Sequence, residues 1–405
     1  MEGIKINSKN VALYNSLVST SEREWTYQFP FLDFMKINFD YYNAHVEKLE
    51  GYVKEQVSKR QDITDALTSN LLCTMSHYLA GRVPLAYGAM RSAFDSVKDI
   101  LIRKSESRAT RGAEFGFRAR VVNRGNPPLT SKADMFHIPF EKRHLVNDQR
   151  YSIRGFPSVY LGRSIYGCYL EMGSPPLDSF FVSLFYFLPN KDDAPKSQRI
   201  RLIDLTDAES KEDIFLMLSS VEKDELSHVN TLNRIVDNIL LWPLVMSCSV
   251  IRSYQESPHF RAEYIIPQML YQLCSEKDEF SGIEYDSAKN LAGGNKKKLR
   301  SVMQNYALPI QKILPVGHCP ILAGQLCLTE PITAKMCDGM KIVERFGHTV
   351  NSLPIISAKC DTLKENETIL ALDRMTMYFD EILLNFRQGK DLAGISPLYG
   401  WRAGS

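Results

Sequence analysis

A compact set of arginines and aromatic residues lies between Phe136 and Glu171, in the segment FHIPFEKRHLVNDQRYSIRGFPSVYLGRSIYGCYLE. A guanidinium is a planar fork of donors that matches a phosphate or pyrophosphate, and a neighbouring aromatic ring can stack on a base. Glu171 ends a mainly apolar stretch that begins at Tyr160. Some of Arg143, Arg150, Arg154 and Arg163 could therefore hold a phosphate-bearing ligand. The pattern alone favours a solvated surface instead, because most charged side chains lie there.

Other signatures of chemistry are missing from the sequence. It contains no GxxxxGK[ST] phosphate loop, no GxGxxG fingerprint, no HExxH and no GxSxG. The eight cysteines include no CxxC pair, which argues against a disulfide framework and a zinc cage. His137 and His144 have no third ligand nearby, so packing or loop roles are expected for them. The lysine-rich run 296–300 would contact phosphates or form a solvated loop. We expect no metal.

The elements that must position these residues change in character along the chain. The first 110 residues predict helices, with an apolar stripe formed by Met90, Phe94, Val97 and Leu101 and a similar pattern from Asp40 to Val57. Residues 108–113 (RATRGA) are typical of a linker. We therefore expect an N-terminal helical domain at 1–110, with a sensing, regulatory or oligomerisation role.

Strand-like segments then alternate with helical ones, which predicts an α+β fold. Short runs rich in β-branched and aromatic residues occur at 115–122, 159–162, 180–188 and 200–205, and they return near Ile283 and at 306–314. A helical stretch lies between about Lys211 and Tyr254. The tail predicts a final helix that stops at Gly389, with one apolar face formed by Ile369, Leu372, Phe379, Ile382 and Phe386. The expected domains are a mixed one at 115–335 and a C-terminal helical extension at 336–405.

Composition limits the partners and the compartment. A chain of 405 residues is long enough for two or three domains, and 44 % hydrophobic and 24 % charged residues are ordinary for a globular protein. The net charge of +2 gives no argument for nucleic acid or an acidic membrane as partner. The N-terminus is polar, and the most apolar stretch, from Ile239 to Ile251, is short and contains Pro243. We expect a cytoplasmic protein that binds neither membrane nor nucleic acid.

Five segments, in the same order along the chain, resemble the RES domain family. They are GFRARVV (116–122), QRYSIRGFPSVYLGRSIYGCYLE (149–171), LWPLVMSCSV (241–250), FRAEYIIPQML with SGIEYDS (260–270 and 281–287), and QNYALPI with CPILAGQLCLTEP (304–310 and 319–331). The resemblance covers a little over half of the chain and leaves both flanks unexplained. The long separation of Arg118 from Arg150 and the long insertion at 207–256 depart from compact members of the family.

The resemblance implies a fold akin to ADP-ribosyltransferase toxins, with a split β core that binds NAD. It also implies cleavage of the bond between nicotinamide and ribose by water or inorganic phosphate, with NAD as substrate. Members are mostly toxins of bacterial toxin–antitoxin pairs or antiviral defence effectors that deplete NAD. By position, the expected catalytic residues are Glu171, Arg118 and Ser287, and the expected NAD-binding residues are Arg118, Arg120, Arg150, Tyr151, Tyr160 and Ser287. Arg118 and Arg120 are rivals for the family's first arginine.

The chemistry assigns each group a role. Nicotinamide leaves as a neutral molecule, so the enzyme must stabilise the positive charge that develops on the ribose, which is the role expected of Glu171. The arginines would clamp the pyrophosphate, Tyr160 would stack on nicotinamide, and Ser287 would hydrogen-bond near the ribose or phosphate.

Three alternatives stay open: an ADP-ribosyltransferase acting on protein or nucleic acid, a HEPN-like nuclease in the N-terminal helices, and an inactive binding module. The nuclease is disfavoured because no arginine precedes His45 or His77 at the required spacing. Since an NAD-degrading toxin must be restrained, we expect an antitoxin or activating partner, a homo-oligomer, or autoinhibition.

Overall fold

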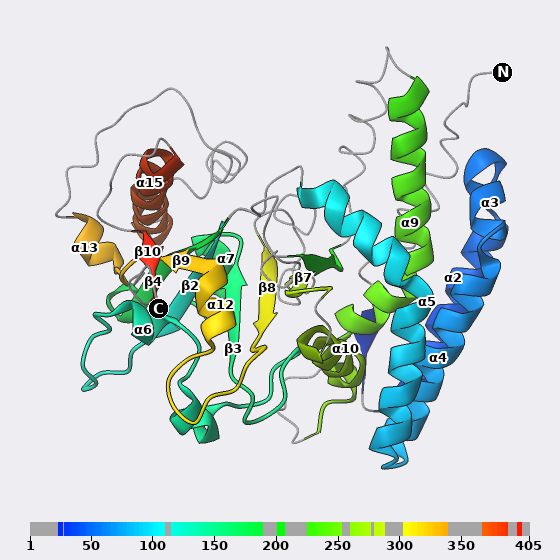
Figure 1. Ribbon diagram of the computed structural model, residues 1–405, viewed down its shortest axis with the longest axis horizontal. Helices are drawn as coiled ribbons and strands as arrows, with labels where there is room; N and C mark the ends of the chain where they lie inside the picture. Colours follow the sequence, from blue (N-terminus) through cyan, green and yellow to red (C-terminus); the bar gives the residue numbers. More distant parts are fainter. Residues whose placement is uncertain are drawn as a thin grey trace, which may run out of the picture. The chain divides into compact units, whose positions relative to one another are not determined.

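The computed structural model describes residues 23–26, 28–109, 115–188, 201–206, 225–252, 260–276, 279–287, 303–338, 367–387 and 395–398. The chain forms two compact units, which Figure 1 shows coloured along the sequence. The first unit comprises Met1–Thr110, Gln149–Tyr151 and Ile203–Leu273, and the second comprises Arg111–Asp148, Ser152–Leu202 and Cys274–Ser405. Helices and a β-sheet occur together, which confirms the predicted α+β class. No helix in the described part of the chain is long and apolar enough to cross a membrane.

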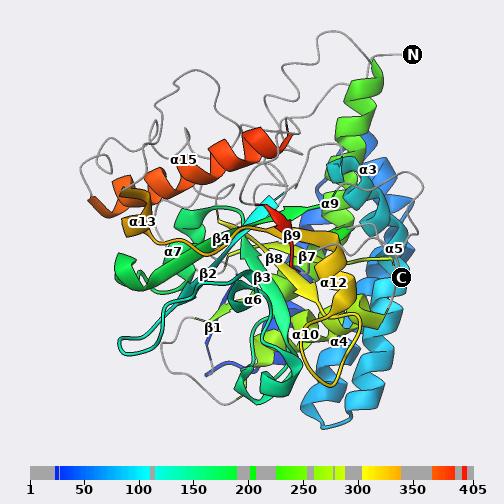
Figure 2. The same ribbon diagram turned by 60° about the vertical axis from the view of Figure 1, so that its left-hand side comes forward.

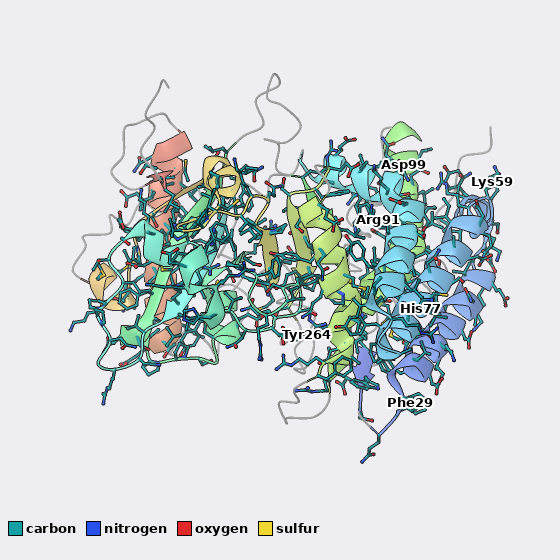
Figure 3. The ribbon with its side chains drawn as sticks, turned by 60° about the horizontal axis from the view of Figure 1, so that its bottom comes forward. Phe29, Lys59, His77, Arg91, Asp99 and Tyr264 are labelled. Atoms are coloured by element: carbon teal, nitrogen blue, oxygen red, sulfur yellow. The ribbon has the colours of Figure 1, made fainter. Side chains whose placement is uncertain are left out.

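The first unit is mainly helical, as its N-terminal sequence predicted. Its helices are α2 (Phe31–Glu47), α3 (Gly51–Ser58), α4 (Gln61–Leu79), α5 (Val83–Ala109), α9 (Glu225–Ser249) and most of α10 (Ile265–Glu276), and β1 (Glu24–Trp25) pairs in parallel with β6 (Ile251–Arg252). The predicted stripe on α5 is confirmed, because Met90, Phe94, Val97 and Leu101 are all buried. His77, in the last turn of α4, and Arg91, on α5, mark this unit in Figure 3.

Helix α9 completes the core of the first unit. Its Trp242 stacks on Tyr42 of α2, with ring centroids 5.4 Å apart and planes 4° apart. The guanidinium of Arg103 on α5 binds the carboxylate of Asp237 in two hydrogen bonds, of 2.7 and 2.9 Å. Residues 203–273 therefore belong to the same compact unit as the N-terminal helices, although the sequence placed them inside the 115–335 domain. The functional division into three domains stays a prediction.

The second unit is built on a sheet with the strand order β10-β9-β4-β2-β3-β8-β7-β5, and all of these strands except β5 lie wholly within it. The strands are β2 (Phe115–Val121), β3 (Ser158–Gly162), β4 (Phe180–Phe187), β5 (Leu202–Asp204), β7 (Gly282–Asp286), β8 (Gln304–Pro309), β9 (Leu326–Leu328) and β10 (Ser396–Pro397). The predicted strand segments are confirmed, apart from residues 310–314, which follow the end of β8.

The pairing between β2 and β3 is much shorter than the pairing of either strand with its other neighbour. Strand β2 pairs with β4 from Phe115 to Val121, and β3 pairs with β8 from Ser158 to Gly162. Between β2 and β3 the only paired residues are Phe117 and Gly162. The sheet is therefore divided by a seam between β2 and β3, with the strands β10-β9-β4-β2 on one side and β3-β8-β7-β5 on the other.

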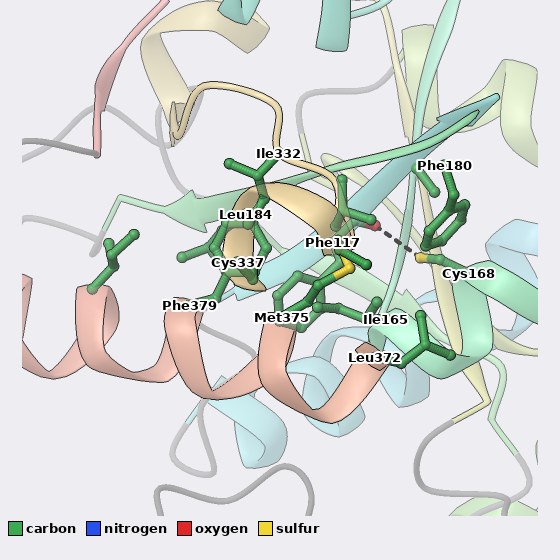
Figure 4. Packing of buried hydrophobic residues seen from close by; sticks show 14 of the residues in the cluster. Phe117, Ile165, Cys168, Phe180, Leu184, Ile332, Cys337, Leu372, Met375 and Phe379 are labelled. Atoms are coloured by element: carbon green, nitrogen blue, oxygen red, sulfur yellow. Dashed lines mark hydrogen bonds between the residues drawn. The ribbon is translucent and has the colours of Figure 1, made fainter. Parts of the chain in front are cut away.

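Helices cover both faces of β4, which explains its continuous apolar run. All eight of its residues are buried. Phe180, Val182 and Leu184 pack in the cluster shown in Figure 4, together with α7 (Ile165–Glu171), α13 (Ala334–Asp338) and α15 (Glu367–Arg387), whereas Phe181 and Phe185 pack on the other face with α6 (Lys132–Met135) and α12 (Pro320–Gln325). The predicted tail helix is α15, and its Ile369, Leu372, Phe379 and Ile382 are buried. Gly389 and the side chain of Phe386 lie outside the described residues.

Candidate functional site

A polar cluster around Glu171 is assembled from three elements of the second unit. The Ser287 hydroxyl donates a hydrogen bond to Oε1 of Glu171, and Nδ2 of Asn305 donates to the same oxygen at 3.0 Å. Glu171 is the last residue of α7, Ser287 directly follows β7, and Asn305 lies in β8. Ser287 and Asn305 are 1 % and 8 % exposed, whereas Glu171 is partly exposed. The structure thus brings together Glu171 and Ser287, two of the three predicted catalytic residues.

The two donors compensate for an unfavourable position in the helix. The last carbonyl groups of a helix carry partial negative charge, so a carboxylate at that end is repelled. Glu171 occupies this position in α7. Hydrogen bonds from Ser287 and Asn305 offset the repulsion and restrict the rotation of the side chain, so tertiary contacts, and not the helix, fix this carboxyl.

Helix α7 lies close to β3 because residue 162 is a glycine. A Cβ atom at Gly162 would lie 2.6 Å from Sγ of Cys168, well inside contact distance. The Cys168 thiol donates to the carbonyl of Phe117 at 3.3 Å, the contact drawn in Figure 4. Burial raises the pKa of this thiol to about 12, so it stays a protonated donor. The Ser164 hydroxyl caps the start of α7 by accepting from the N–H of Gly167 at 2.9 Å.

Backbone hydrogen bonds hold the cluster at the ends of the strands. The N–H of Ser287 donates to the carbonyl of Met303, and the N–H of Arg163 donates to the carbonyl of Gln304, both at 2.8 Å. These bonds extend the pairing of β7 and β3 with β8 by one residue beyond each strand. Gly162 also pairs with Asn305, so the short connection from β3 to α7 begins beside the residue whose amide binds Glu171.

Arg118 and Arg120 project from the face of β2 opposite to the one that α7 covers. Successive side chains of a strand point to opposite faces, and Phe117 and Ala119 pack in the cluster that contains α7. Nη1 of Arg118 donates to the carbonyl of Tyr160 at 3.2 Å, across the seam between β2 and β3. Nη2 of Arg120 donates to a backbone carbonyl at 3.0 Å. Burial lowers the pKa of Arg120, although Asp134 favours its charged form.

A pair of histidines lies near these arginines. The rings of His137 and His318 meet edge to face, with centroids 4.9 Å apart. Nδ1 of His137 bonds to the carbonyl of Ile138, and its Nε2 accepts from the N–H of Cys319, both at 2.8 Å. Burial lowers the pKa of His137 to about 4, so the ring is neutral near pH 7 and acts as a structural acceptor. Among the described residues, no group of three or more His, Cys, Asp or Glu side chains could hold a metal ion.

The remaining predicted residues divide between the two units. In the second unit, the hydroxyl of Tyr160 donates to that of Ser152 at 3.1 Å. Arg150 and Tyr151 belong to the first unit, where Arg150 donates to two backbone carbonyls at 3.0 and 3.1 Å and lies 5.3 Å from the ring centre of Tyr264. Tyr151 is 1 % exposed in that unit. Their roles in NAD binding stay predictions.

Two features of the cluster's surroundings escaped the sequence analysis. Asn305 lies within QNYALPI, a segment that resembles the RES domain family, but the resemblance implies no role for it. Glu284 is fully buried, with Oε1 3.8 Å from Nη1 of Arg163, and that same nitrogen lies 3.5 Å from the hydroxyl of Tyr306. The sequence does carry one signal for both residues, because each is a polar or charged residue inside a mainly apolar strand. Such a residue usually has a buried polar partner.

Comparison with known proteins finds one distant relative. The chain is 28 % identical over 304 residues to the protein named "Putative toxin YopC" of Bacillus subtilis (strain 168). The aligned part makes up 72 % of this chain and 64 % of that protein, so the chain spans less than two thirds of its relative's length. No family model matches the chain. No solved structure matches it.

Proposed function

We propose that the second unit cleaves the bond between nicotinamide and ribose in NAD, with water or inorganic phosphate as acceptor, and that the chain is a toxin that depletes NAD. The observation that carries the proposal is the Glu171 carboxyl, which Ser287 and Asn305 hold from two other elements. The ordered resemblance to the RES domain family supports it, as does the name of the relative. The thin β2–β3 seam is consistent with the split core of an ADP-ribosyltransferase-like fold.

Glu171 supplies the electrostatic part of this reaction. Positive charge develops on the ribose as nicotinamide departs, and a carboxylate beside that ring stabilises the charge in the transition state. Donors on Oε1 hold the carboxyl in one orientation before the substrate arrives, so little reorganisation is needed during the reaction. Ser287 therefore acts on the reaction through Glu171, in addition to the contact with ribose or phosphate that the resemblance implies.

The arginines and the aromatic residues bind the rest of NAD in this proposal. A guanidinium offers five N–H donors in a fixed fork, which suits a pyrophosphate. The resemblance alone assigns this role to Arg118, with Arg120 as its rival, because both project from the face of β2 opposite to the one that α7 covers. It assigns to Tyr160 the stacking on nicotinamide. The resemblance implies NAD-binding roles for Arg150 and Tyr151 as well, but both belong to the first unit, so these roles are not part of the proposal for the second unit.

The decisive test follows NAD concentration over time with the purified full-length chain. Glu171→Gln keeps the size of the side chain but removes its charge, and we expect turnover to fall by about 100-fold or more. The matched control is Glu330→Gln, because Glu330 is exposed and lies after β9. Thermal unfolding of both variants shows whether each is folded. A folded Glu171→Gln variant with wild-type turnover would refute the assignment.

The same assay identifies the acceptor. Free ADP-ribose that forms without phosphate indicates hydrolysis, whereas ADP-ribose 1-phosphate that forms only with phosphate indicates phosphorolysis. Label from NAD that is retained on protein or nucleic acid of a cell extract would favour the ADP-ribosyltransferase alternative. A folded wild-type chain that consumes no NAD under any of these conditions contradicts the proposed function.

A further inference from the structure

Three loops of the second unit, residues 140–146, 153–156 and 312–317, form a surface that is both apolar and basic, here named the loop surface. Four of its side chains are large, apolar and exposed: Leu145 is 58 % exposed, Phe156 38 %, Ile313 55 % and Val316 64 %. Single exposed apolar residues are common on proteins, but several gathered on neighbouring loops mark an interaction surface.

Hydrogen bonds between the loops hold this surface in shape. The N–H of Phe140 donates to the carbonyl of Gly317 at 2.9 Å, and the N–H of Gly317 donates to Oε2 of Glu141 at 2.8 Å. Nε of Arg143 donates to the carbonyl of Gly155 at 2.9 Å. Figures 1 and 2 both show the loop between β8 and α12 beside the segment that precedes β3. A partner would therefore meet a preformed surface and lose little binding energy to the ordering of these loops.

The outward charge of the loop surface is positive. Lys142, Arg154 and Lys312 are exposed. Glu141 and Asp148 are exposed as well, but each accepts a hydrogen bond from a backbone N–H, Glu141 from Gly317 and Oδ1 of Asp148 from Arg154 at 2.7 Å. With Arg143, the basic side chains of this region outnumber these two carboxylates. In two of the loops a basic residue comes shortly before an apolar one, since Lys312 directly precedes Ile313 and Arg154 lies two residues before Phe156.

The loop surface is separate from the Glu171 cluster. Strands β3 and β8 connect the two places, because Gly162 pairs with Asn305 beside Glu171, while Ser158 pairs with Pro309 next to the loops. The four steps of strand from Ser158 to Gly162 span roughly 13 Å. A ligand of the Glu171 cluster therefore does not account for the exposed apolar residues.

We propose that the loop surface binds a partner protein through an acidic segment that also carries aliphatic side chains. Carboxylates of such a segment would complement Lys142 and Lys312, and its aliphatic groups would cover Leu145, Ile313 and Val316. A second copy of this chain is a poorer partner, because the same surface on two subunits would bring cations together. Nucleic acid is disfavoured because the Arg143 guanidinium, with Cζ 5.2 Å from the ring centre of Phe156, already occupies one face of the ring that would stack on a base. The proposal does not depend on NAD cleavage.

The test selects peptides from a random library displayed on phage, with the full-length chain as target, and measures each selected peptide by fluorescence anisotropy. We expect selected peptides to be acidic and rich in aliphatic residues. The double variant Lys142→Glu with Lys312→Glu should weaken their binding by about tenfold or more, because attraction across the interface becomes repulsion. Leu145→Ser with Val316→Ser should weaken it as well.

The matched control is Arg124→Glu with Lys335→Glu, which changes the net charge equally at exposed residues outside the three loops. It should leave peptide affinity within about twofold, since distant surface charges are screened by salt. Unchanged thermal unfolding shows that each variant is folded. Failure to enrich acidic peptides, or equal binding to the Lys142 and Lys312 variant, would overturn the proposal. A third outcome is binding to vesicles of phosphatidylcholine and phosphatidylglycerol, lost only in the Lys142→Glu with Lys312→Glu variant, while no peptide binds. That result would show that the loop surface binds membranes and would overturn the proposal of a protein partner.

Discussion

Gly162→Ala tests whether the close approach of α7 to β3 builds the candidate site. The new Cβ atom would lie 2.6 Å from Sγ of Cys168, which is buried. This clash can be relieved only if the Cys168 side chain rotates or α7 moves away from β3. Such overpacking costs about 1–3 kcal/mol, and the loss of a glycine returns about 0.4–1 kcal/mol through the unfolded chain. We therefore expect a net destabilisation of the second unit by about 1–2 kcal/mol.

The assay is urea unfolding of the wild-type chain, the two single variants Gly162→Ala and Cys168→Ala, and the double variant. Hydrogen exchange of the β3 amides restricts the measurement to the second unit. Cys168→Ala removes the sulfur that clashes with the new methyl group, so Gly162→Ala should be neutral or slightly stabilising in that background. The coupling free energy between the two changes should be about 1–3 kcal/mol.

NAD turnover of the same four proteins tests the effect of the two substitutions on activity. A displaced α7 moves Glu171 away from Asn305, so Gly162→Ala should lower turnover, and Cys168→Ala should restore it. If Gly162→Ala costs the same free energy with and without Cys168, the contact between residues 162 and 168 does not position α7, and the reasoning fails.

Three further changes test other parts of the structure. Asn305→Ala should lower kcat by about tenfold or more and leave KM nearly unchanged, because Asn305 orients the carboxyl and does not bind NAD, and a change in KM alone would contradict this role. Arg103→Ala leaves Asp237 buried without its two-bond partner, so urea unfolding should show the first unit destabilised by about 1–3 kcal/mol, and Arg103→Lys should recover only part of that loss. His137 has a pKa lowered from 6.5 to about 4, so its neutral form contributes stability that is fully present above pH 6.5 and is lost as the pH falls toward 4. The variant His137→Asn should therefore lose less stability than the wild type over that pH range, and identical profiles would contradict the role of burial.

Local patterns were enough to predict most of the secondary structure. Helix α5 was predicted because Met90, Phe94 and Val97 recur at helical spacing, and burial of that stripe is what stabilises the helix. Strand β4 was predicted from a run of apolar residues, which the structure explains by its burial on both faces.

Long-range pairing could not be predicted in the same way. Asn305 binds Glu171 because β8 pairs with β3 in one particular register, and a polar residue in an apolar strand does not reveal its partner. Helix α9 was assigned to the mixed domain because its neighbours in sequence form strands. Its stacking of Trp242 on Tyr42 instead places it with the N-terminal helices.

The two units are interleaved along the chain, and this has a consequence for biosynthesis. Apart from Gln149–Tyr151, the chain leaves the first unit after Thr110 and returns to it only at Ile203, so Tyr42 is made long before Trp242. At ribosomal speeds the intervening 200 residues take roughly 10–40 s, during which the apolar faces of the N-terminal helices lack α9 and would be a substrate for chaperones. The Glu171 cluster is delayed in the same way, because Asn305 is translated 134 residues after Glu171. Under the proposed function, a nascent chain from which Glu171 has emerged would stay inactive until β8 has also left the ribosome, and this delay would protect the cell during translation.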